Sequence, residues 1–213
     1  SECLGKPFYH NEQSLRVVDI LEKNGEGLNL TYEVRMGILG HTGERIPETL
    51  EGQIVRYSDR FAYVNHDIDD AIRGGILSNE DIPGSISKVL GSVHSERVNS
   101  LACDLISTSR ESGVIQLSPE VDTALQDLRS FLFENVYRNP IAKGQETKAQ
   151  SMLKRLYDYY FNNPDALPPD FQPQMSFDGL ERIVCDYVAG MTDHYAVDKY
   201  TELFIPMGWH IRG

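Results

Sequence analysis

A polar stripe along the segment Leu50–Ile72 holds the residues of this sequence best suited to chemistry. At about 100° per residue, the segment is predicted to form an amphipathic helix. Its polar face collects acidic, basic, imidazole and phenol side chains: Arg56, Asp59, Arg60, Tyr63, His66, Asp67 and Asp70. Carboxylates and imidazoles bind divalent metals, arginine suits phosphate, and tyrosine with aspartate suits a sugar bearing hydroxyl groups. The simplest alternative is a solvated helix face, the usual fate of such a stripe.

The opposite face of the same predicted helix is apolar and is expected to lie in the core. It carries residues that fall within one narrow arc of the helical wheel: Leu50, Ile54, Tyr57, Phe61, Val64, Ile68 and Ile72. Arg56 and Arg60, on the polar side, are expected to supply positive charge to a bound anion.

Helical patterns recur along the rest of the chain, so the fold class is predicted to be all-α with at most a short β-element. Besides 47–72, helices are expected near residues 11–24, 31–39, 94–109, 119–132, 147–161 and 177–188, with another beginning at Ser85. Val114–Leu117 is the one β-like run of note, and Phe204–Pro206 is a weaker one.

Composition excludes several classes of function. The 213 residues include 32 acidic and 20 basic side chains, a formal net charge of −12, which argues against nucleic acid or an anionic membrane as the main partner. No run approaches the roughly 20 apolar residues that span a bilayer. The cysteines form no CxxC pair, and no signal-peptide pattern is present, so a reducing, cytoplasmic location is expected.

The pair His66–Asp67, with His41 before it and Asp104 after it, follows the ligand order of the HD metal-dependent phosphohydrolases. We reject this assignment. His66 and Asp67 would have to turn toward a metal from a helix that already faces it with Asp59, and His41 lies between glycines, where a loop is expected.

Four longer strings resemble another group within the HD superfamily, the deoxyguanosinetriphosphate triphosphohydrolase-like proteins. They are His10–Val18, Leu28–Arg35, Thr49–Ile72 and Asp186–Ala196. The resemblance implies an HD-domain-like helical bundle in which 1–213 is a single helical unit, with active-site helices in 1–112 and a C-terminal helical region in 113–213. In that family the first metal-binding His and the His-Asp pair precede the string that begins at His10, so the chain is expected to be the C-terminal portion of a longer protein.

The resemblance also implies a role for each matched residue. Asp59 corresponds to the fourth metal ligand, Arg60 to a contact of the triphosphate, Tyr63 and Asp67 to contacts of the deoxyribose, and His10 to an acid/base near the α-phosphate. Without the family context a structural role is favoured over catalysis, with His10 simply preceding a helix beside a cap at Asn11. Arg16, Arg35 and Arg97 could reach a phosphate, but each is interpreted as a partner in an ordinary salt bridge.

The activity implied by the resemblance is hydrolysis of a deoxynucleoside triphosphate, such as dGTP, to deoxynucleoside and triphosphate. It would need a divalent metal, Mg, Mn or another, that polarises the α-phosphate. Asp59 alone cannot hold a metal tightly, so this chain by itself is expected to be inactive, and the intact protein is expected to be a homo-oligomer. The alternative is a non-catalytic module for oligomerisation or nucleotide sensing.

Overall fold

The computed structural model describes residues 5, 7–173 and 175–207, and within these ranges every regular element is helical. The prediction of an all-α fold is therefore confirmed. The chain divides into two compact units, one made of 1–29 with 145–213 and the other of 30–144. The division at residue 112 and the single helical unit that the resemblance implied stay predictions. No helix of the described residues is long and apolar enough to cross a membrane.

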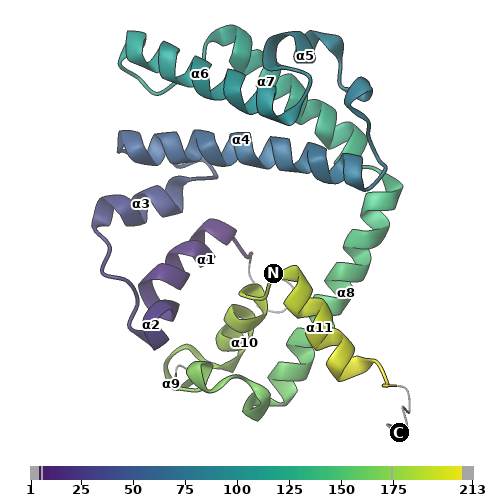
Figure 1. Cartoon of the computed structure of the whole chain (residues 1–213). Coiled ribbons are helices and arrows are strands. Elements are labelled where there is room, and N and C mark those ends of the chain that lie inside the picture. Colours follow the sequence, from purple (N-terminus) through teal and green to yellow (C-terminus); the bar gives the residue numbers. More distant parts are fainter. Residues whose placement is uncertain (1–4, 6, 174, 208–213) are drawn as a thin grey trace, which may run out of the picture. The chain divides into compact units, whose positions relative to one another are not determined.

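The unit of residues 30–144 (unit 2) is built around one long helix. Its elements are α3 (Tyr32–Gly40), α4 (Leu50–Arg73), η2 (Asn79–Asp81), α5 (Gly84–Leu90), α6 (His94–Ser112), α7 (Pro119–Leu132), the π-helical turn η3 (Phe133–Tyr137) and the start of α8 (Pro140–Asn162). Threonine and serine side chains begin three of these helices by accepting a backbone N–H, as Thr49 does from Gly52 at 3.2 Å. Helix α4 runs alongside α6 and α7 (Figure 1).

The core of unit 2 lies between α4 and the helices α5–α7. Helix α4 contributes Phe61, Val64 and Ile68, which pack with Leu101 of α6 and Leu128 of α7. The prediction that the whole apolar face of α4 is buried is wrong at its N-terminal end.

Leu50 and Ile54, at that N-terminal end, are exposed by 54% and 44%. The reason is that the first turns of α4 meet α3 through glycines. A Cβ built on Gly52 would stand 3.3 Å from the Cα of Gly37, so no large side chain fits between the two helices there.

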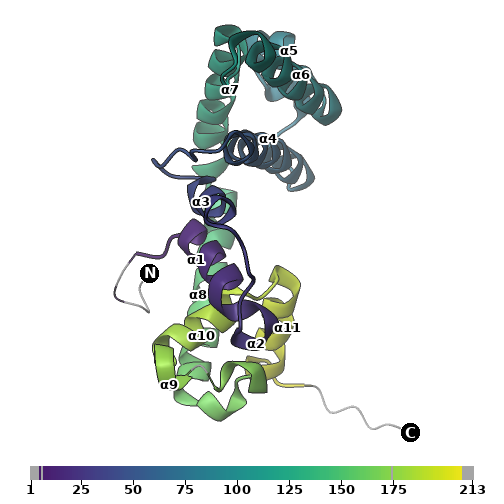
Figure 2. The same cartoon turned by 90° about the vertical axis from the view of Figure 1, so that its left-hand side faces the viewer.

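The other unit (unit 1) is formed by an N-terminal and a C-terminal part of the chain, residues 1–29 and 145–213. Its elements are α1 (His10–Arg16), the π-helical η1 (Val17–Leu21), α2 (Glu22–Gly25), most of α8, η4 (Pro164–Ala166), η5 (Pro169–Phe171), α9 (Met175–Asp178), α10 (Leu180–Ala189) and α11 (Asp193–Phe204). In Figure 2 the purple α1 lies next to the yellow-green α10, although nearly the whole chain separates them in sequence. Leu156, Tyr160, Ile183 and Val184 form the centre of this unit's core.

Neither β-like run forms a strand. The backbone N–H of Gln116, within the run 114–117, donates to Ser109 Oγ at 3.0 Å instead of to a neighbouring strand, and Phe204 is the last residue of α11. Helix α8 begins at Pro140 rather than near Thr147. The helix expected from Phe177 is interrupted at Gly179, whose φ of +80° favours glycine.

Candidate functional site

A cleft of about 800 Å³ opens in unit 2 between α4 and the continuous α7–η3 segment. Arg60 and Tyr63 line it from α4. From the other side it is lined by residues that recur every three or four positions: Gln126, Arg129, Ser130, Phe133, Glu134 and Tyr137. This spacing puts them on one face of α7–η3. The cleft thus combines two guanidinium groups and three aromatic rings with a single carboxylate, a set suited to an anion that carries a ring.

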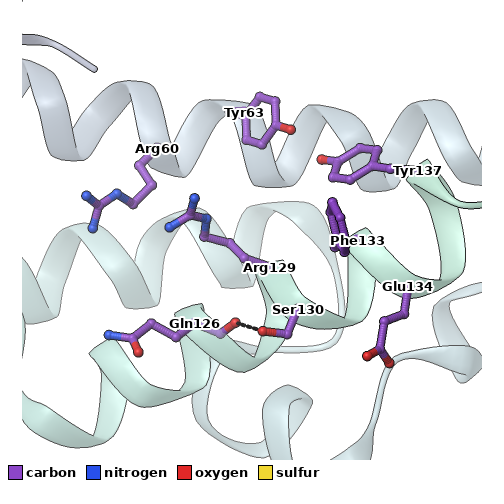
Figure 3. Close-up of a pocket in the computed structure, with 8 residues that line it drawn as sticks. All are labelled: Arg60, Tyr63, Gln126, Arg129, Ser130, Phe133, Glu134 and Tyr137. Carbon is purple, nitrogen blue, oxygen red and sulfur yellow. Dashed lines mark hydrogen bonds between the residues drawn. The ribbon is translucent and has the colours of Figure 1, made fainter. Parts of the chain in front are cut away.

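The side chains converge on the space between the two helices (Figure 3). Arg60 and Arg129 extend into the same end of the cleft from opposite sides, while the hydroxyl ends of Tyr63 and Tyr137 turn toward each other at the other end. The centroids of these two tyrosine rings are 6.3 Å apart. Positive charge and aromatic surface therefore occupy different ends of one cleft.

Asp67 lies one turn beyond Tyr63 on α4 and accepts a hydrogen bond from the hydroxyl of Tyr137. Burial, followed by the hydrogen bonds to Asp67 and Tyr63, raises the pKa of Tyr137 far above its usual value. The phenol is consequently a hydrogen-bond donor throughout the physiological pH range. The hydrogen bond joins η3 to α4. It therefore holds the half-buried Asp67 carboxylate in place at the edge of the cleft.

Arg56 does not face the cleft. Its guanidinium donates to the backbone carbonyls of Gly40, Gly43 and Arg45 at 3.0, 2.6 and 2.9 Å. These carbonyls belong to the end of α3 and the loop that follows it. These bonds hold the loop, and the expectation that Arg56 supplies charge to a bound anion stays a prediction.

Asp59 lies on the exposed side of α4 and does not line the cleft. Within the described residues, no three His, Cys, Asp or Glu side chains gather in a way that could hold a metal ion. Asp59 therefore has no second and third protein ligand among the described residues with which to hold a metal. The alternative ligand order also fails to assemble, because Asp104 accepts the backbone N–H of Ser118 at 2.8 Å and Asp67 is bonded to Tyr137.

His10, the fifth residue that the sequence singles out, belongs to unit 1, where it is the first residue of α1 and is exposed. Its carbonyl accepts a hydrogen bond from Ser14 Oγ at 2.8 Å. The side chain of Asn11 provides no cap, because the capping position is Tyr9 and no side chain accepts there.

Helix α1, which carries His10, is fastened to α10 by a buried carboxylate. Asp186 accepts Gln13 Nε2 at 2.9 Å and Arg16 Nε at 2.8 Å, and it pairs with Arg182 at 3.0 Å. Arg16 also pairs with Asp178 at 2.6 Å, so its interpretation as a salt-bridge partner is confirmed.

The same interpretation of Arg97 is wrong. Arg97 is completely buried, and its Nε donates to Asn65 Oδ1 at 2.9 Å rather than to a carboxylate.

The sequence interpretation missed Arg129 and Tyr137. Their segment is identifiable as a helix from Leu125, Leu128 and Leu132, which are buried, but an arginine and a tyrosine on its other face resemble ordinary surface residues. The available signal is the series Arg129, Phe133 and Tyr137 at intervals of four. That series becomes informative only once α4 is known to lie opposite it.

Comparison with known proteins agrees with the resemblance. A family profile described as the phosphohydrolase-associated domain matches residues 115–202. A deoxyguanosinetriphosphate triphosphohydrolase-like protein of Caldanaerobacter subterraneus subsp. tengcongensis is 47% identical over 202 residues, which cover 95% of this chain and 60% of the relative. Proteins of the same description from Clostridium perfringens (strain SM101 / Type A) and Clostridium tetani are 43% and 40% identical, over 93% and 97% of this chain.

The chain spans 60–62% of the length of these three relatives. The match extends through both units, because it covers nearly all of this chain. The chain is therefore a homologue of the deoxyguanosinetriphosphate triphosphohydrolase-like proteins over nearly its whole length, and it contains a phosphohydrolase-associated domain.

Proposed function

We propose that this chain supplies the nucleotide-binding cleft of a deoxynucleoside triphosphate triphosphohydrolase. The reaction adds one water molecule across the bond between the α-phosphorus and the 5′ oxygen. The deoxynucleoside leaves with the proton, and inorganic triphosphate leaves with the hydroxyl group. The observation that carries the proposal is the joint placement of Arg60, Tyr63, Arg129 and Tyr137 in one cleft.

The charge distribution of the cleft supports a triphosphate at one end. Arg60 and Arg129 supply two planar guanidinium groups, which bind phosphate oxygens through paired N–H donors. The chain as a whole carries a net charge of −12. Local positive charge is therefore needed before a polyanion can bind here, and this pair of arginines provides it.

The opposite end of the cleft supports the sugar and base. Tyr63 and Tyr137 offer hydroxyl groups and aromatic faces, and Asp67 is held next to them by Tyr137. A carboxylate accepts hydrogen bonds only, so its partner would be a sugar hydroxyl rather than a phosphate. We propose Asp67 as the partner of the 3′-hydroxyl, Tyr63 as a contact of the deoxyribose and Arg60 as a contact of the triphosphate.

His10 and Asp59 complete the proposal through the resemblance. His10 is proposed as the acid/base and Asp59 as one metal ligand in the intact protein. The metal would supply Lewis-acid chemistry at the phosphate. The described residues of this chain do not form the site of that metal by themselves.

Nucleotide binding by the 213-residue chain tests the cleft directly. Isothermal titration with dGTP should give a dissociation constant that rises about ten- to a hundredfold in Arg60→Ala and in Arg129→Ala, the usual cost of a lost charged hydrogen bond. Arg73→Ala is the matched control, because Arg73 is also on α4 but is 75% exposed and does not line the cleft. Inorganic triphosphate should compete with dGTP.

An equal loss in Arg73→Ala, or no loss in either cleft variant, would contradict the proposed binding site. Catalysis is tested separately, by measuring the release of triphosphate from dGTP by the full-length natural protein that contains this chain. Binding without any hydrolysis there would favour a nucleotide-sensing module over an enzyme.

A further inference from the structure

Two imidazole rings face each other between α4 and α6 in unit 2. His66 is on α4 and His94 is the first residue of α6, and their ring centroids are 5.7 Å apart with an interplanar angle of 60°. His66 is exposed and the side chain of His94 is 38% exposed, so solvent and small ions reach both. Neither ring lines the cleft described above.

A carboxylate orients one of the two rings. Asp69 Oδ2 lies 2.6 Å from His94 Nδ1. When Nδ1–H donates to this carboxylate, the lone pair of the neutral ring is on Nε2, which is then the nitrogen available to a ligand. A carboxylate bonded to the far nitrogen is the usual outer partner of a metal-binding histidine, because it fixes the tautomer and raises the basicity of the ring.

The helices that carry these rings are locked together directly beneath them. Asn65, adjacent to His66, and Arg97, one turn after His94, are both completely buried. Arg97 Nε donates to Asn65 Oδ1 at 2.9 Å. The two imidazoles are therefore mounted on rigid elements, which hold ligands more precisely than loops do.

The local charge is compatible with a cation. Asp69 from α4 and Glu96 from α6 carry the negative charges that interact with Arg97, a cation buried beneath the rings. Burial lowers the pKa of Arg97 from its usual value, and these two carboxylates oppose that shift. Their negative charges balance the guanidinium, so its field does not exclude a divalent ion from the histidine pair.

We propose that His66 and His94 bind a borderline divalent transition-metal ion, such as Zn²⁺ or Ni²⁺, with Asp69 as the outer carboxylate. Imidazole ligands favour these ions, whereas Mg²⁺ and Ca²⁺ prefer oxygen. The described residues around the rings offer no third protein ligand, so water completes the coordination. The ion bridges α4 and α6, and the site is independent of Asp59 and of the proposed catalysis.

Metal titration of the 213-residue chain tests the proposal. Calorimetry with Ni²⁺ should show one binding event whose affinity falls at least about tenfold in His66→Ala and in His94→Ala, with a smaller loss in Asp69→Asn. His194→Ala should bind Ni²⁺ as the parent does, because His194 is an exposed residue of α11 in unit 1.

A second measurement separates the site from a loss of folding. Saturating Ni²⁺ should raise the melting temperature of the parent by a few °C, since the ion binds only the folded pairing of α4 and α6. His66→Gln, which keeps a polar side chain on the helix surface, should fold normally and lose this rise. Unchanged Ni²⁺ binding in both alanine variants, or an equal loss in His194→Ala, would overturn the proposal.

Discussion

The hydroxyl of Tyr137 donates a hydrogen bond to the carboxylate of Asp67 across 70 positions of the chain. This bond joins η3 to α4 at the edge of the cleft, next to the packed pair Tyr63 and Tyr137. It links a residue that the resemblance assigns to substrate binding with one that the sequence interpretation overlooked. The geometry of Asp67 therefore depends on a helix turn far away in sequence.

The first prediction concerns alkaline pH. Burial and the bond to Asp67 raise the pKa of Tyr137 above its value of about 10 in an unfolded chain. A group with a raised pKa in the folded state contributes its full stabilisation below the unfolded pKa and loses it as the pH rises further. The free energy of unfolding should therefore fall above pH ~10, and it should fall less steeply in Tyr137→Phe.

Urea unfolding at pH 8 and pH 11 measures this difference. Tyr32→Phe is the control, because Tyr32 lies in the same unit but is 57% exposed. Identical pH slopes for the parent and Tyr137→Phe would contradict the role of the Tyr137–Asp67 bond.

The second prediction concerns Asp186. This carboxylate is 1% exposed and receives hydrogen bonds or ion pairs from Gln13, Arg16 and Arg182. Asp186→Ala should destabilise unit 1 by about 3–5 kcal/mol, because it removes the buried acceptor shared by Gln13 and Arg16 and leaves Arg182 without its carboxylate, while Arg16 keeps only Asp178.

Urea unfolding monitored by circular dichroism measures the loss of stability. Asp70→Ala is the control, since Asp70 pairs with Arg73 on the surface, where such pairs contribute about 1 kcal/mol or less. A loss in Asp186→Ala no larger than in Asp70→Ala would show that the network does not fasten α1 to α10.

Local sequence signals predict where most of the helices begin and end, but they do not predict which other helices pack against them. Thr31, Thr49 and Ser118 mark helix starts, and Gly113 in the left-handed region ends α6, all of which are properties of a few adjacent residues. The exposed Leu50 and Ile54 were predicted to be buried because periodicity identifies an apolar face but not its neighbour.

The candidate site was predictable only along one helix. The stripe on α4 follows from its period, and it brings Arg60 and Tyr63 together as expected. Arg129 and Tyr137 enter from a helix that only the tertiary fold places opposite. Arg56 also lies on the stripe but does not line the cleft. Its position on the helix does not reveal that three backbone carbonyls accept its hydrogen bonds.

The third prediction concerns two helical glycines with opposite surroundings. A Cβ on Gly52 would lie 2.6 Å from Pro47 Cβ, whereas a Cβ on Gly144, within α8, has nothing within 4 Å. Gly52→Ala should destabilise unit 2 by about 1–3 kcal/mol through overpacking. Gly144→Ala should stabilise the chain by about 0.5–1 kcal/mol, since alanine loses less backbone entropy in a helix. Thermal unfolding of both variants checks the two signs, and a shared sign would contradict the close packing of Pro47 against Gly52 of α4.

The fourth prediction separates two aspartates of the stripe, and it rests on the proposed function. In the full-length natural protein that contains this chain, Asp59→Ala should remove the metal ion of the proposed catalytic centre and the turnover of dGTP, because Asp59 is proposed as an anionic ligand of that ion. An ion held by His66 and His94 should stay bound, so the metal content of each variant is compared with that of the parent. Asp67→Ala should keep the metal and mainly weaken substrate binding, by about 1.5–3 kcal/mol, the scale of a charged hydrogen bond. Elemental analysis of each purified variant, read beside its Michaelis constant, distinguishes the two roles.

Tyr137→Phe provides the matched control for Asp67, because it removes the bond that holds the carboxylate but leaves the carboxylate in place. It should raise the Michaelis constant less than Asp67→Ala does, with the metal content unchanged. The rejected ligand order, in which His66 and Asp67 bind the metal, requires the reverse pattern: Asp67→Ala would lose the metal and Asp59→Ala would retain it. Full metal content and activity in both aspartate variants would instead reduce the stripe to a solvated face of α4.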